Sequence, residues 1–432
     1  MLNIKLIREN PEKIIADLAK KGTDARETIV QILALDVVRR EAIQMRETNK
    51  AKQNQVSKQI AKMKQTGEDC AHIMAEMKVL STMVKKVGER LVELEGQEHD
   101  LLLTLPNVPD DDVAEGGKEH NQTVRIFGNE KTFDFQPKHH VDLCTSLGLI
   151  DYERGTKLSG TGFWVYTGIG ARLEWALLNY FIDTHLADGY ELTLIPHVLG
   201  YEAGLTAGQF PKFADDVFWL ASEDGERKQF LLPTAETALV SLHQGEILDV
   251  ATLPRKYISY TPCFRREAGS HGAAERGMVR GHQFNKVEMV QYATPDQSDV
   301  AFEELVGKAE ALVRDLGFHF RTVKLAAGDC SASMARTYDI EIHIPSMGGY
   351  KEVSSVSNAR DYQARRGMMR YRNPETGKPD YVHTLNGSGL ATSRILPAIV
   401  EQNQQADGSV IIPEVLRKYL GGIEKIEPIC KG

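Results

Sequence analysis

Apolar side chains in the first hundred residues recur with the spacing of a coiled coil. From Ile73 onward they follow steps of four and three residues, and the polar Glu98 occupies one of these positions. The expected seam consists of Ile73, Met77, Leu80, Val84, Val87, Leu91, Leu94, Glu98 and Leu101. Such alternation is the a/d pattern of helices that pack along a coiled-coil seam.

A similar spacing upstream, and a break between the two runs, predict a helical hairpin. The upstream seam positions are Ala42, Arg46, Asn49, Gln53, Val56, Ile60 and Met63. In the break, Gly67 can end one helix, and Glu68 and Asp69 can start the next. We therefore expect a long antiparallel hairpin with its tip near Gly67. Arms of roughly 35 residues would each be about 50 Å long.

The coiled-coil spacing ends after Leu105, where two prolines and then three aspartates interrupt the pattern. This predicts an N-terminal arm over 1–105, a linker over 106–128 and a larger domain over 129–432. In the larger domain, β-rich runs at 192–195, 284–292 and 340–344 alternate with helical patterns at 171–185 and 300–316. Such a mixture predicts one α+β domain.

Charge is distributed unevenly between these parts. The chain has a formal net charge of -8, but residues 46–90 contain ten basic and five acidic residues. This segment therefore carries +5 and the remainder -13. A basic arm on an acidic body suits binding to a phosphate backbone. The alternative is that these lysines are simply the solvated surface of a coiled coil, and charge does not distinguish the two.

Cysteine usage and the N-terminus indicate a cytoplasmic protein. The five cysteines are Cys70, Cys144, Cys263, Cys330 and Cys430, and no two form a C-x-x-C pair. This favours reduced thiols over a disulfide framework or a zinc ribbon. We expect no secretion signal and no membrane span, because no apolar run is long enough for either.

A predicted pair of strands in the larger domain carries groups suited to a nucleotide. Arg265 and Glu267 follow an apolar run, and Phe284 begins another after a loop rich in Gly and Arg. Alternation would place Arg265 and Glu267 on one face, and Phe284, Lys286 and Glu288 on one face of the partner strand. Arginine can bind phosphate, a carboxylate can accept from an adenine amine, and phenylalanine offers a stacking surface. A surface hairpin with salt-bridged arginines is the alternative for this motif taken alone.

Three further segments carry weaker signals. The glycine-rich run at 386–389 leads into a predicted helix with Arg394 in its first turns, where arginine can reach phosphate. Pro397 in that helix should bend it. Glu352, Ser354 and Ser355 offer hard oxygen ligands suited to Mg²⁺. Taken alone, each segment, and the Thr234-Ala235-Glu236 run, could be an ordinary turn, edge strand or helix start.

Together these segments resemble a known enzyme family. F-R-x-E at 264–267, with its loop and second strand, is similar to motif 2 of class II aminoacyl-tRNA synthetases, and G-x-G-L-A-x-x-R at 387–394 to their motif 3. Residues 189–196 resemble motif 1, which builds the dimer interface in that class. The T-A-E run, T-L-N-G-S-G-L-A at 384–391 and the basic arm resemble the seryl-tRNA synthetase family in particular.

The resemblance implies a class II catalytic domain built on an antiparallel sheet, and with it a reaction, substrates and site residues. L-serine would react with ATP and Mg²⁺ to give seryl-adenylate, and the seryl group would pass to tRNA(Ser), with tRNA(Sec) as a further candidate. The implied catalytic residues are Arg265 and Arg394. The implied ATP-binding residues are Arg265, Arg266, Glu267, Phe284, Glu352, Val353, Ser354, Ser355 and Arg394. The implied serine-binding residues are Thr234, Ala235, Glu236, Arg265, Glu288 and Ser388. Glu352 and Ser355 would hold the metal, Lys58, Lys62 and Lys64 would bind tRNA, and the protein would be a homodimer.

The chain departs from the family pattern at a few positions, and two other functions remain open. The departures are Thr237, Ala238, His343, Val356 and Pro397. None is an implied ligand, so we expect effects on local packing only. A homologue that loads an amino acid onto another acceptor is disfavoured by the intact arm. A coiled-coil scaffold without activity is disfavoured by the intact set of ligands.

Overall fold

The computed structural model describes residues 1–226, 228–267 and 277–429, and the chain forms two compact units. The first unit contains Met1–Ala19 and Thr23–Pro106. The second contains Lys20–Gly22 and Asn107–Gly432. In the described residues, no helix combines the length and the apolar character needed to cross a bilayer.

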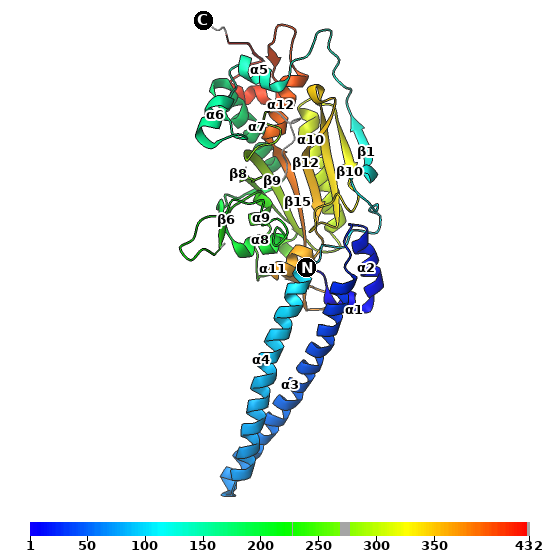
Figure 1. Ribbon diagram of the computed structural model, residues 1–432, viewed down its shortest axis with the longest axis vertical. Coiled ribbons are helices and arrows are strands. Elements are labelled where there is room, and N and C mark those ends of the chain that lie inside the picture. Colours follow the sequence, from blue (N-terminus) through cyan, green and yellow to red (C-terminus); the bar gives the residue numbers. More distant parts are fainter. Residues whose placement is uncertain (227, 268–276, 430–432) are drawn as a thin grey trace. The chain divides into compact units, whose positions relative to one another are not determined.

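The first unit is a helical hairpin on a short helical base (Figure 1). Its helices are α1 (Ile4–Glu9), α2 (Pro11–Ala19), α3 (Arg26–Thr66) and α4 (Ala71–Thr104). Gly67 caps α3 in the left-handed conformation, at φ 77°, and its N–H bonds to the carbonyl of Met63. A glycine is favoured there because other residues are strained at positive φ. The predicted antiparallel hairpin and its tip are confirmed.

Burial along α4 follows the predicted seam except near its end. Leu80, Leu91, Leu94 and Glu98 are buried, as the spacing predicts, but the next buried position is Leu102. The prediction of Leu101 was therefore wrong. The buried positions here are separated by two consecutive steps of four residues, from Leu94 to Glu98 and from Glu98 to Leu102. Steps of three, four and four make up an 11-residue repeat, whose 3.67 residues per turn lie closer to the 3.6 of a straight α-helix than the 3.5 of a heptad do. In α3 the predicted seam position Arg46 is exposed, whereas Val56 is buried.

The polar seam residue Glu98 belongs to a charged cluster within the first unit. Arg39 contacts Glu98 at 3.2 Å and Asp36 at 2.7 Å, so one guanidinium links α4 to α3. Asp36 also accepts from Arg8 of α1, at 2.8 Å, and from Arg40. Burial alone would raise the pKa of Asp36, but the hydrogen bonds from Arg8 and Arg39 lower it. Breaking a buried pair of this kind leaves an uncompensated charge, so the cluster fixes how these helices align.

The second unit is built on an eight-stranded sheet with the order β1-β10-β11-β12-β15-β9-β8-β4. Every pair of neighbours is antiparallel except β4 and β8. The strands are β1 (Gln122–Phe127), β4 (Glu191–Leu192), β8 (Arg255–Phe264), β9 (Gln283–Ala293), β10 (Phe320–Lys324), β11 (Arg336–Ile344), β12 (Gly349–Asn358) and β15 (His383–Ala391). The predicted α+β class with an antiparallel sheet is confirmed.

The two faces of this sheet have different roles. One face packs against α7 (Gly168–Ala187), α10 (Ser298–Asp315) and α12 (Thr392–Gln402), which supply much of the main core (Figure 1). Val287, Met289 and Leu385 point into this core. The intervening residues of β9 face α8 (Tyr201–Ala207), α9 (Ala235–Leu239) and α11 (Tyr362–Gly367). Polar side chains on this second face are therefore free to line a cavity.

Smaller elements complete the second unit. The short helices are α5 (His140–Ser146), α6 (Tyr152–Ser159) and α13 (Glu414–Arg417). The short strands are β2 (Ile150–Asp151), β3 (Val165–Tyr166), β5 (Val198–Gly200), β6 (Gln229–Leu231), β7 (Ile247–Leu248), β13 (Arg370–Arg372), β14 (Pro379–Tyr381), β16 (Val410–Ile411) and β17 (Lys425–Ile426). The cysteines at 70, 144, 263 and 330 are free thiols, and Cys430 lies outside the described residues.

The segment expected to be a linker, 106–128, contains regular structure. Its β1 strand pairs with β10 at the edge of the large sheet. The buried Asn107 donates from Nδ2 to the carbonyls of Ser333, at 3.0 Å, and Ala359, at 2.8 Å. The prolines and aspartates correctly mark the end of the coiled coil, but the chain after them is anchored to the second unit.

The strand pair around Arg265 differs from the alternation expected for it. β8 ends at Phe264, so Arg265 and Glu267 lie beyond the strand. Glu267 adopts a positive φ of 51°, which departs from the extended backbone of a strand. The two residues are therefore not part of the strand as expected, although both still line the same cavity. The middle of the loop that follows, 268–276, lies outside the described residues.

Candidate active site

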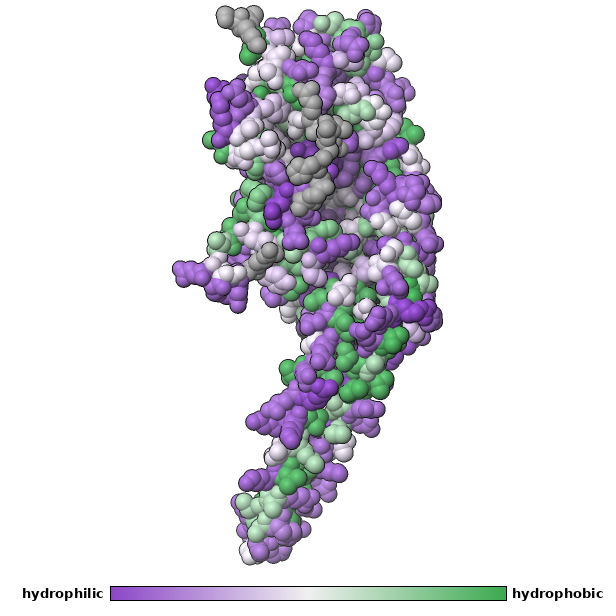
Figure 2. Space-filling model, viewed as in Figure 1, coloured by the Kyte–Doolittle hydropathy of each residue, from purple (hydrophilic) through white to green (hydrophobic). Residues whose placement is uncertain are grey.

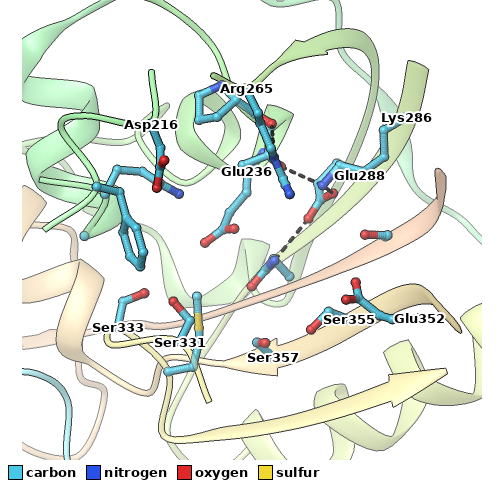
Figure 3. Close-up of a pocket in the computed structure, with 18 of the residues that line it drawn as sticks. Asp216, Glu236, Arg265, Lys286, Glu288, Ser331, Ser333, Glu352, Ser355 and Ser357 are labelled. Atoms are coloured by element: carbon cyan, nitrogen blue, oxygen red, sulfur yellow. Dashed lines mark hydrogen bonds and ion pairs between the residues drawn. The ribbon is translucent and has the colours of Figure 1, made fainter. Parts of the chain in front are cut away.

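A polar cavity of about 490 Å³ lies on the second face of the sheet (Figure 3). Most of the residues implied by the family resemblance line it. They are Thr234, Glu236, Arg265, Glu267, Glu288, Glu352, Ser355, Ser388 and Arg394. A smaller cavity of about 80 Å³ shares several of these residues and adds Phe284 and Val353. Segments far apart in the sequence therefore converge on one site.

Of the residues implied for serine or ATP binding, three do not line either cavity. Ala235 is buried within α9. Ser354 is fully buried and donates from Oγ to the carbonyl of Ser388 at 2.6 Å. The Arg266 guanidinium donates to the carbonyl of Asp215 at 3.4 Å. Ser354 thereby supports Ser388, which does line the cavity.

Charged groups on β9 form the centre of the site. Lys286 pairs with Glu288 and donates to the Thr234 hydroxyl at 2.7 Å. Glu288 also accepts from Nδ2 of Asn386 at 3.0 Å. Because residues two apart on a strand face the same way, Phe284, Lys286 and Glu288 all point toward the cavity side. The alternation in the sequence predicted this arrangement.

Glu236 is the second carboxylate of this region and is set in a different environment. It lies in the first turn of α9, whose N-terminus is capped by the Thr234 hydroxyl accepting from the Glu236 N–H at 3.3 Å. Its Oε1 accepts from the Gln363 amide at 3.0 Å. Burial, reinforced by the neighbouring Glu288, raises its pKa to about 7. Glu236 is therefore poised to gain or lose a proton near neutral pH.

Two arginines, Arg265 and Arg394, line both cavities. The Arg265 guanidinium lies 5.2 Å from the centre of the Phe284 ring and donates to the carbonyl of Pro233 at 3.3 Å. Arg394, the third residue of α12, donates to the carbonyl of Glu352 at 2.6 Å and lies 3.5 Å from its carboxylate. Backbone carbonyls hold both guanidinium groups, and Arg394 is also paired with the Glu352 carboxylate. Arg265 forms no ion pair among the described residues, so its positive charge is available for an anion.

The position of α12 depends on a buried carboxylate behind the sheet. Glu174 of α7 accepts from Thr392 Oγ1 and, at 2.7 Å, from Asn285 Nδ2. Thr392 is two residues before Arg394, and Asn285 lies between Phe284 and Lys286. Burial raises the pKa of Glu174 to about 7. Pro397 lies inside α12, which nevertheless continues to Gln402.

A β-bulge explains why Glu352 and Ser355 face the same side although they are three residues apart. The pairing of β12 with β11 shifts between Ser354 and Glu352, which leaves Val353 as an extra residue. Without the bulge, residues three apart on a strand would point to opposite faces. The extra residue brings Glu352 to the same face as Ser355, so both side chains reach the cavity. Asp339, opposite Ser355 on β11, is buried, and burial and the nearby Glu352 raise its pKa well above the usual range. Its Oδ1 has no hydrogen-bond partner among the described residues.

Several residues that line or support the cavity were not identified from the sequence. Lys286 was placed on the right face but not assigned to a ligand. Ser331 and Ser333 lie in the loop between β10 and β11, which Lys21 holds by donating to the carbonyls of Ser331 and Met334. No local pattern marks these serines. Asn386, Ser357 and Asp216 also line the cavity, and Gln363 supports it.

Comparison with known proteins assigns the family. Residues 1–109 match the model of the seryl-tRNA synthetase N-terminal domain, and residues 218–403 match the class II tRNA synthetase core domain for G, H, P, S and T. Serine–tRNA ligase 2 of Clostridium acetobutylicum is 57% identical, over 98% of this chain and 99% of its own. The chain belongs to the seryl-tRNA synthetase family. The serine–tRNA ligase of Clostridium tetani is 44% identical, over 99% of this chain and 100% of its own.

Solved structures of the same family match over the whole chain. Seryl-tRNA synthetase from Pyrococcus horikoshii, complexed with ATP, matches with a TM-score of 0.91 and 33% identity, covering 100% of both chains. Cytoplasmic serine–tRNA ligase from Naegleria fowleri, in complex with AMP, matches with a TM-score of 0.87 and 29% identity, covering 100% of this chain and 99% of its own. The synthetase fold is therefore present from end to end.

The departures from the family pattern lie away from the cavity lining. Thr237 and Ala238 are buried within α9. Val356 is buried at the β12–β15 pair, where its Cγ2 would lie 3.1 Å from a Cβ placed on Gly387. His343 packs beside the ring of Tyr350. Thr237, Ala238 and Val356 are buried, whereas His343 is half-buried, and none of the four lines the cavity.

Proposed function

We propose that this seryl-tRNA synthetase family member activates L-serine with ATP and transfers the seryl group to the 3′ end of tRNA(Ser). A serine carboxylate oxygen attacks the α-phosphorus, and the bond to pyrophosphate breaks, giving seryl-adenylate. The 3′-terminal ribose hydroxyl of tRNA then attacks the seryl carbonyl, and AMP leaves. The observation that carries this proposal is that Arg265, Arg394, Glu236 and Glu288 converge on one cavity. Serine-dependent ATP–pyrophosphate exchange, followed by tRNA charging, tests it.

Positioning and charge neutralisation account for the first step, because the attacking group belongs to the substrate. We infer that Arg265 binds the α-phosphate and the serine carboxylate, where negative charge gathers as the new bond forms. Arg394 binds the γ-phosphate, since it points into the cavity from the start of α12. Phe284 supplies the surface on which the adenine stacks, and Glu267 accepts from the adenine amine. Arg266 and Ser354 support this region through backbone contacts.

Mg²⁺ suits the hard oxygen groups beside the triphosphate region. Glu352 and Ser355 would hold it, and the buried Oδ1 of Asp339, which has no hydrogen-bond partner among the described residues, is a further oxygen opposite Ser355. When bound, the metal would neutralise phosphate charge. Val353 contributes through the bulge that turns Glu352 toward the cavity.

Serine fits the region between α9 and β9. Glu288 is already paired with Lys286 and Asn386, whereas Glu236 forms no ion pair among the described residues. We therefore assign Glu236 to the serine ammonium group, and Glu288 with Ser388 to its hydroxyl. Thr234 and the backbone around Ala235 complete the pocket. A site that hydrogen-bonds a substrate hydroxyl can reject the analogue without it by about 10⁴–10⁵, so alanine is refused without editing.

Ser388→Ala combined with Glu288→Gln should raise KM for serine far more than KM for ATP. Both side chains line the larger cavity beside Asn386, on the side assigned to serine. The loss should be at least about tenfold, because hydrogen bonds to a charged group contribute about 1.5–3 kcal/mol. Initial rates of exchange, with each substrate varied in turn, measure both constants. Equal increases for serine and ATP would place these residues in the nucleotide site instead.

We infer that residues 1–105 are a tRNA-binding arm and 129–432 a catalytic domain. Lys58, Lys62 and Lys64 are exposed on α3. Figure 2 shows hydrophilic and apolar surface alternating along the hairpin. Val38 and Met83 are among the exposed apolar side chains of its two helices. Lysines on such a surface suit contacts with the phosphates of a long stem. tRNA(Sec) is a second candidate acceptor, because an arm that binds phosphates does not read the anticodon.

We also infer a cytoplasmic homodimer. Trp175 on α7 is 54% exposed, and Leu194, just after β4, is 81% exposed. Leu194 lies within residues 189–196, which resemble the dimer-forming motif 1, and Trp175 lies on the helix that precedes them. Exposed apolar groups of this size are typical of interaction surfaces. Sedimentation equilibrium should give twice the chain mass of 48.2 kDa for the wild type. Trp175→Asp should weaken the dimer, and a monomeric wild type would contradict the inference.

A further inference from the structure

Gln363 connects Glu236 to elements outside the cavity. It lies in α11, and its side chain is buried, with 1% exposure for the residue. Its Nε2 donates to the carbonyl of Ala207 in α8 at 2.9 Å and to Oε1 of Glu236 in α9 at 3.0 Å. Its Oε1 accepts from Thr384 Oγ1 in β15 at 2.6 Å. One buried amide therefore holds three other elements of the second unit.

The partners of this amide fix its orientation. The Ala207 carbonyl can only accept, so the group that faces it must be the NH₂. An amide NH₂ has two hydrogens, and the second one is committed to Glu236. The Thr384 hydroxyl donates to the remaining oxygen. Because every group is satisfied in this one arrangement, Glu236 Oε1 always meets a donor.

This donor is neutral, and that determines what Glu236 can bind. A lysine or arginine at the same place would hold the carboxylate and also cancel its charge. The amide holds it and leaves the negative charge in place. Burial and the charge of Glu288 oppose ionisation of Glu236. Lys286, the hydrogen bond from Gln363 and Arg265 favour ionisation. The net result is that the pKa of Glu236 is raised to about 7. An incoming cation would find a carboxylate that is already positioned.

We propose that Gln363 is a positioning residue for the amino-acid substrate: its neutral amide aims Glu236 and leaves that carboxylate for an ammonium group. This rests on the proposed function, because it assigns the ammonium of L-serine to Glu236. The substrate class is an amino acid with a free ammonium group. A hydroxy acid of the same shape, such as glycerate, would leave the buried carboxylate unpaired and would be refused.

Serine activation should depend on pH through Glu236. The groups that face Glu236 are Glu288, Lys286 and Arg265, together with the Gln363 amide. A protonated Glu236 has lost the charge that attracts ammonium, so kcat/KM for serine should fall as the pH drops below about 7. Removing the amide donor raises the pKa of Glu236 further. The acid limb should then move to higher pH, which a purely structural defect would not produce.

The test compares Gln363→Met with Gln363→Glu and wild type in serine-dependent ATP–pyrophosphate exchange from pH 6 to pH 9. Methionine keeps the volume without the polar groups, and glutamate keeps the shape but replaces the donor. Gln405→Met is the matched control, because Gln405 is exposed and its amide donates to nearby backbone carbonyls. We expect KM for serine to rise about tenfold to a hundredfold in both Gln363 variants. KM for ATP should change much less, and the acid limb should shift upward.

The outcomes separate this inference from the proposed function. Serine-dependent exchange absent from the wild type would overturn the proposed function itself. Wild-type exchange with variants whose KM for serine is unchanged, or whose two KM values rise together, would overturn the role of Gln363. If neither variant folds by circular dichroism, the wild-type profile decides. A fall of kcat/KM for serine below about pH 7, not matched by kcat/KM for ATP, supports the role. The absence of this fall contradicts the role of Gln363.

Discussion

Replacing Arg265 with alanine should abolish adenylate formation while leaving the fold intact. The Arg265 guanidinium lines both cavities and is held by the carbonyl of Pro233, so its charge is available to the substrates. In the proposed assignment, Arg265 points to the α-phosphate, where negative charge increases as serine attacks. Removing one such donor from an enclosed site typically lowers the rate by about a hundredfold to a thousandfold. Serine-dependent ATP–pyrophosphate exchange measures the loss.

The control for this variant is Arg314→Ala, on the exposed side of α10. It removes the same side chain from the surface, where its partner is the neighbouring Asp315. Thermal unfolding should show that both variants remain folded, since Arg265 contributes mainly a hydrogen bond to one carbonyl and a contact with Phe284. Exchange by a folded Arg265→Ala protein within tenfold of wild type would show that Arg265 is misassigned.

Replacing residues 46–90 with a short turn should separate the two steps of the reaction. Every residue assigned to serine or ATP lies at or beyond Thr234, so exchange should remain nearly unchanged. Charging of tRNA should fall steeply, because we propose that the arm supplies the phosphate contacts that orient the tRNA. Both activities are measured on one preparation. A parallel loss would mean that the hairpin is needed for folding, and full charging would refute its assignment to tRNA.

A milder form of the same change tests the basic residues. Replacing Lys58, Lys62 and Lys64 with alanine should weaken tRNA binding and leave exchange unaffected. The slope of log affinity against log salt should flatten by about 0.7–0.9 for each phosphate that the arm no longer neutralises. Arginine at the same three positions is the matched control, because it keeps the charge and should keep the slope. An unchanged slope in the alanine variant would place the phosphate-binding residues elsewhere.

The sequence predicted the hairpin well because its seam is a local, repeating pattern. Leu80, Leu91 and Leu94 are buried where the spacing placed them, and Gly67 ends the first helix. Near Glu98 the prediction was wrong by one residue, because the buried stripe shifts to Leu102. A strict heptad pattern assumes that the two helices supercoil evenly along their whole length. At this end of the hairpin, side chains of α1 and α3 also hold the helices through the charged cluster around Asp36, which the heptad pattern does not include.

The cavity was predicted less completely, for reasons that lie in the backbone and in long-range contacts. Alternation correctly placed Phe284, Lys286 and Glu288 on one face. It did not reveal that Glu267 adopts a positive φ or that a bulge at Val353 turns Glu352 toward the cavity. Gln363 was missed because its importance comes from contacts with residues far away in the sequence. No pattern within its own segment reports those partners.

The measurement that tests the proposed function most directly is ATP–pyrophosphate exchange with each of the standard amino acids, followed by tRNA charging on the same preparation. We expect rapid exchange with serine, little with alanine or threonine, and transfer of serine to tRNA(Ser). Exchange with serine but no transfer to tRNA would indicate a different acceptor. A folded protein with no serine-dependent exchange would contradict the proposed function and leave the hairpin as a scaffold.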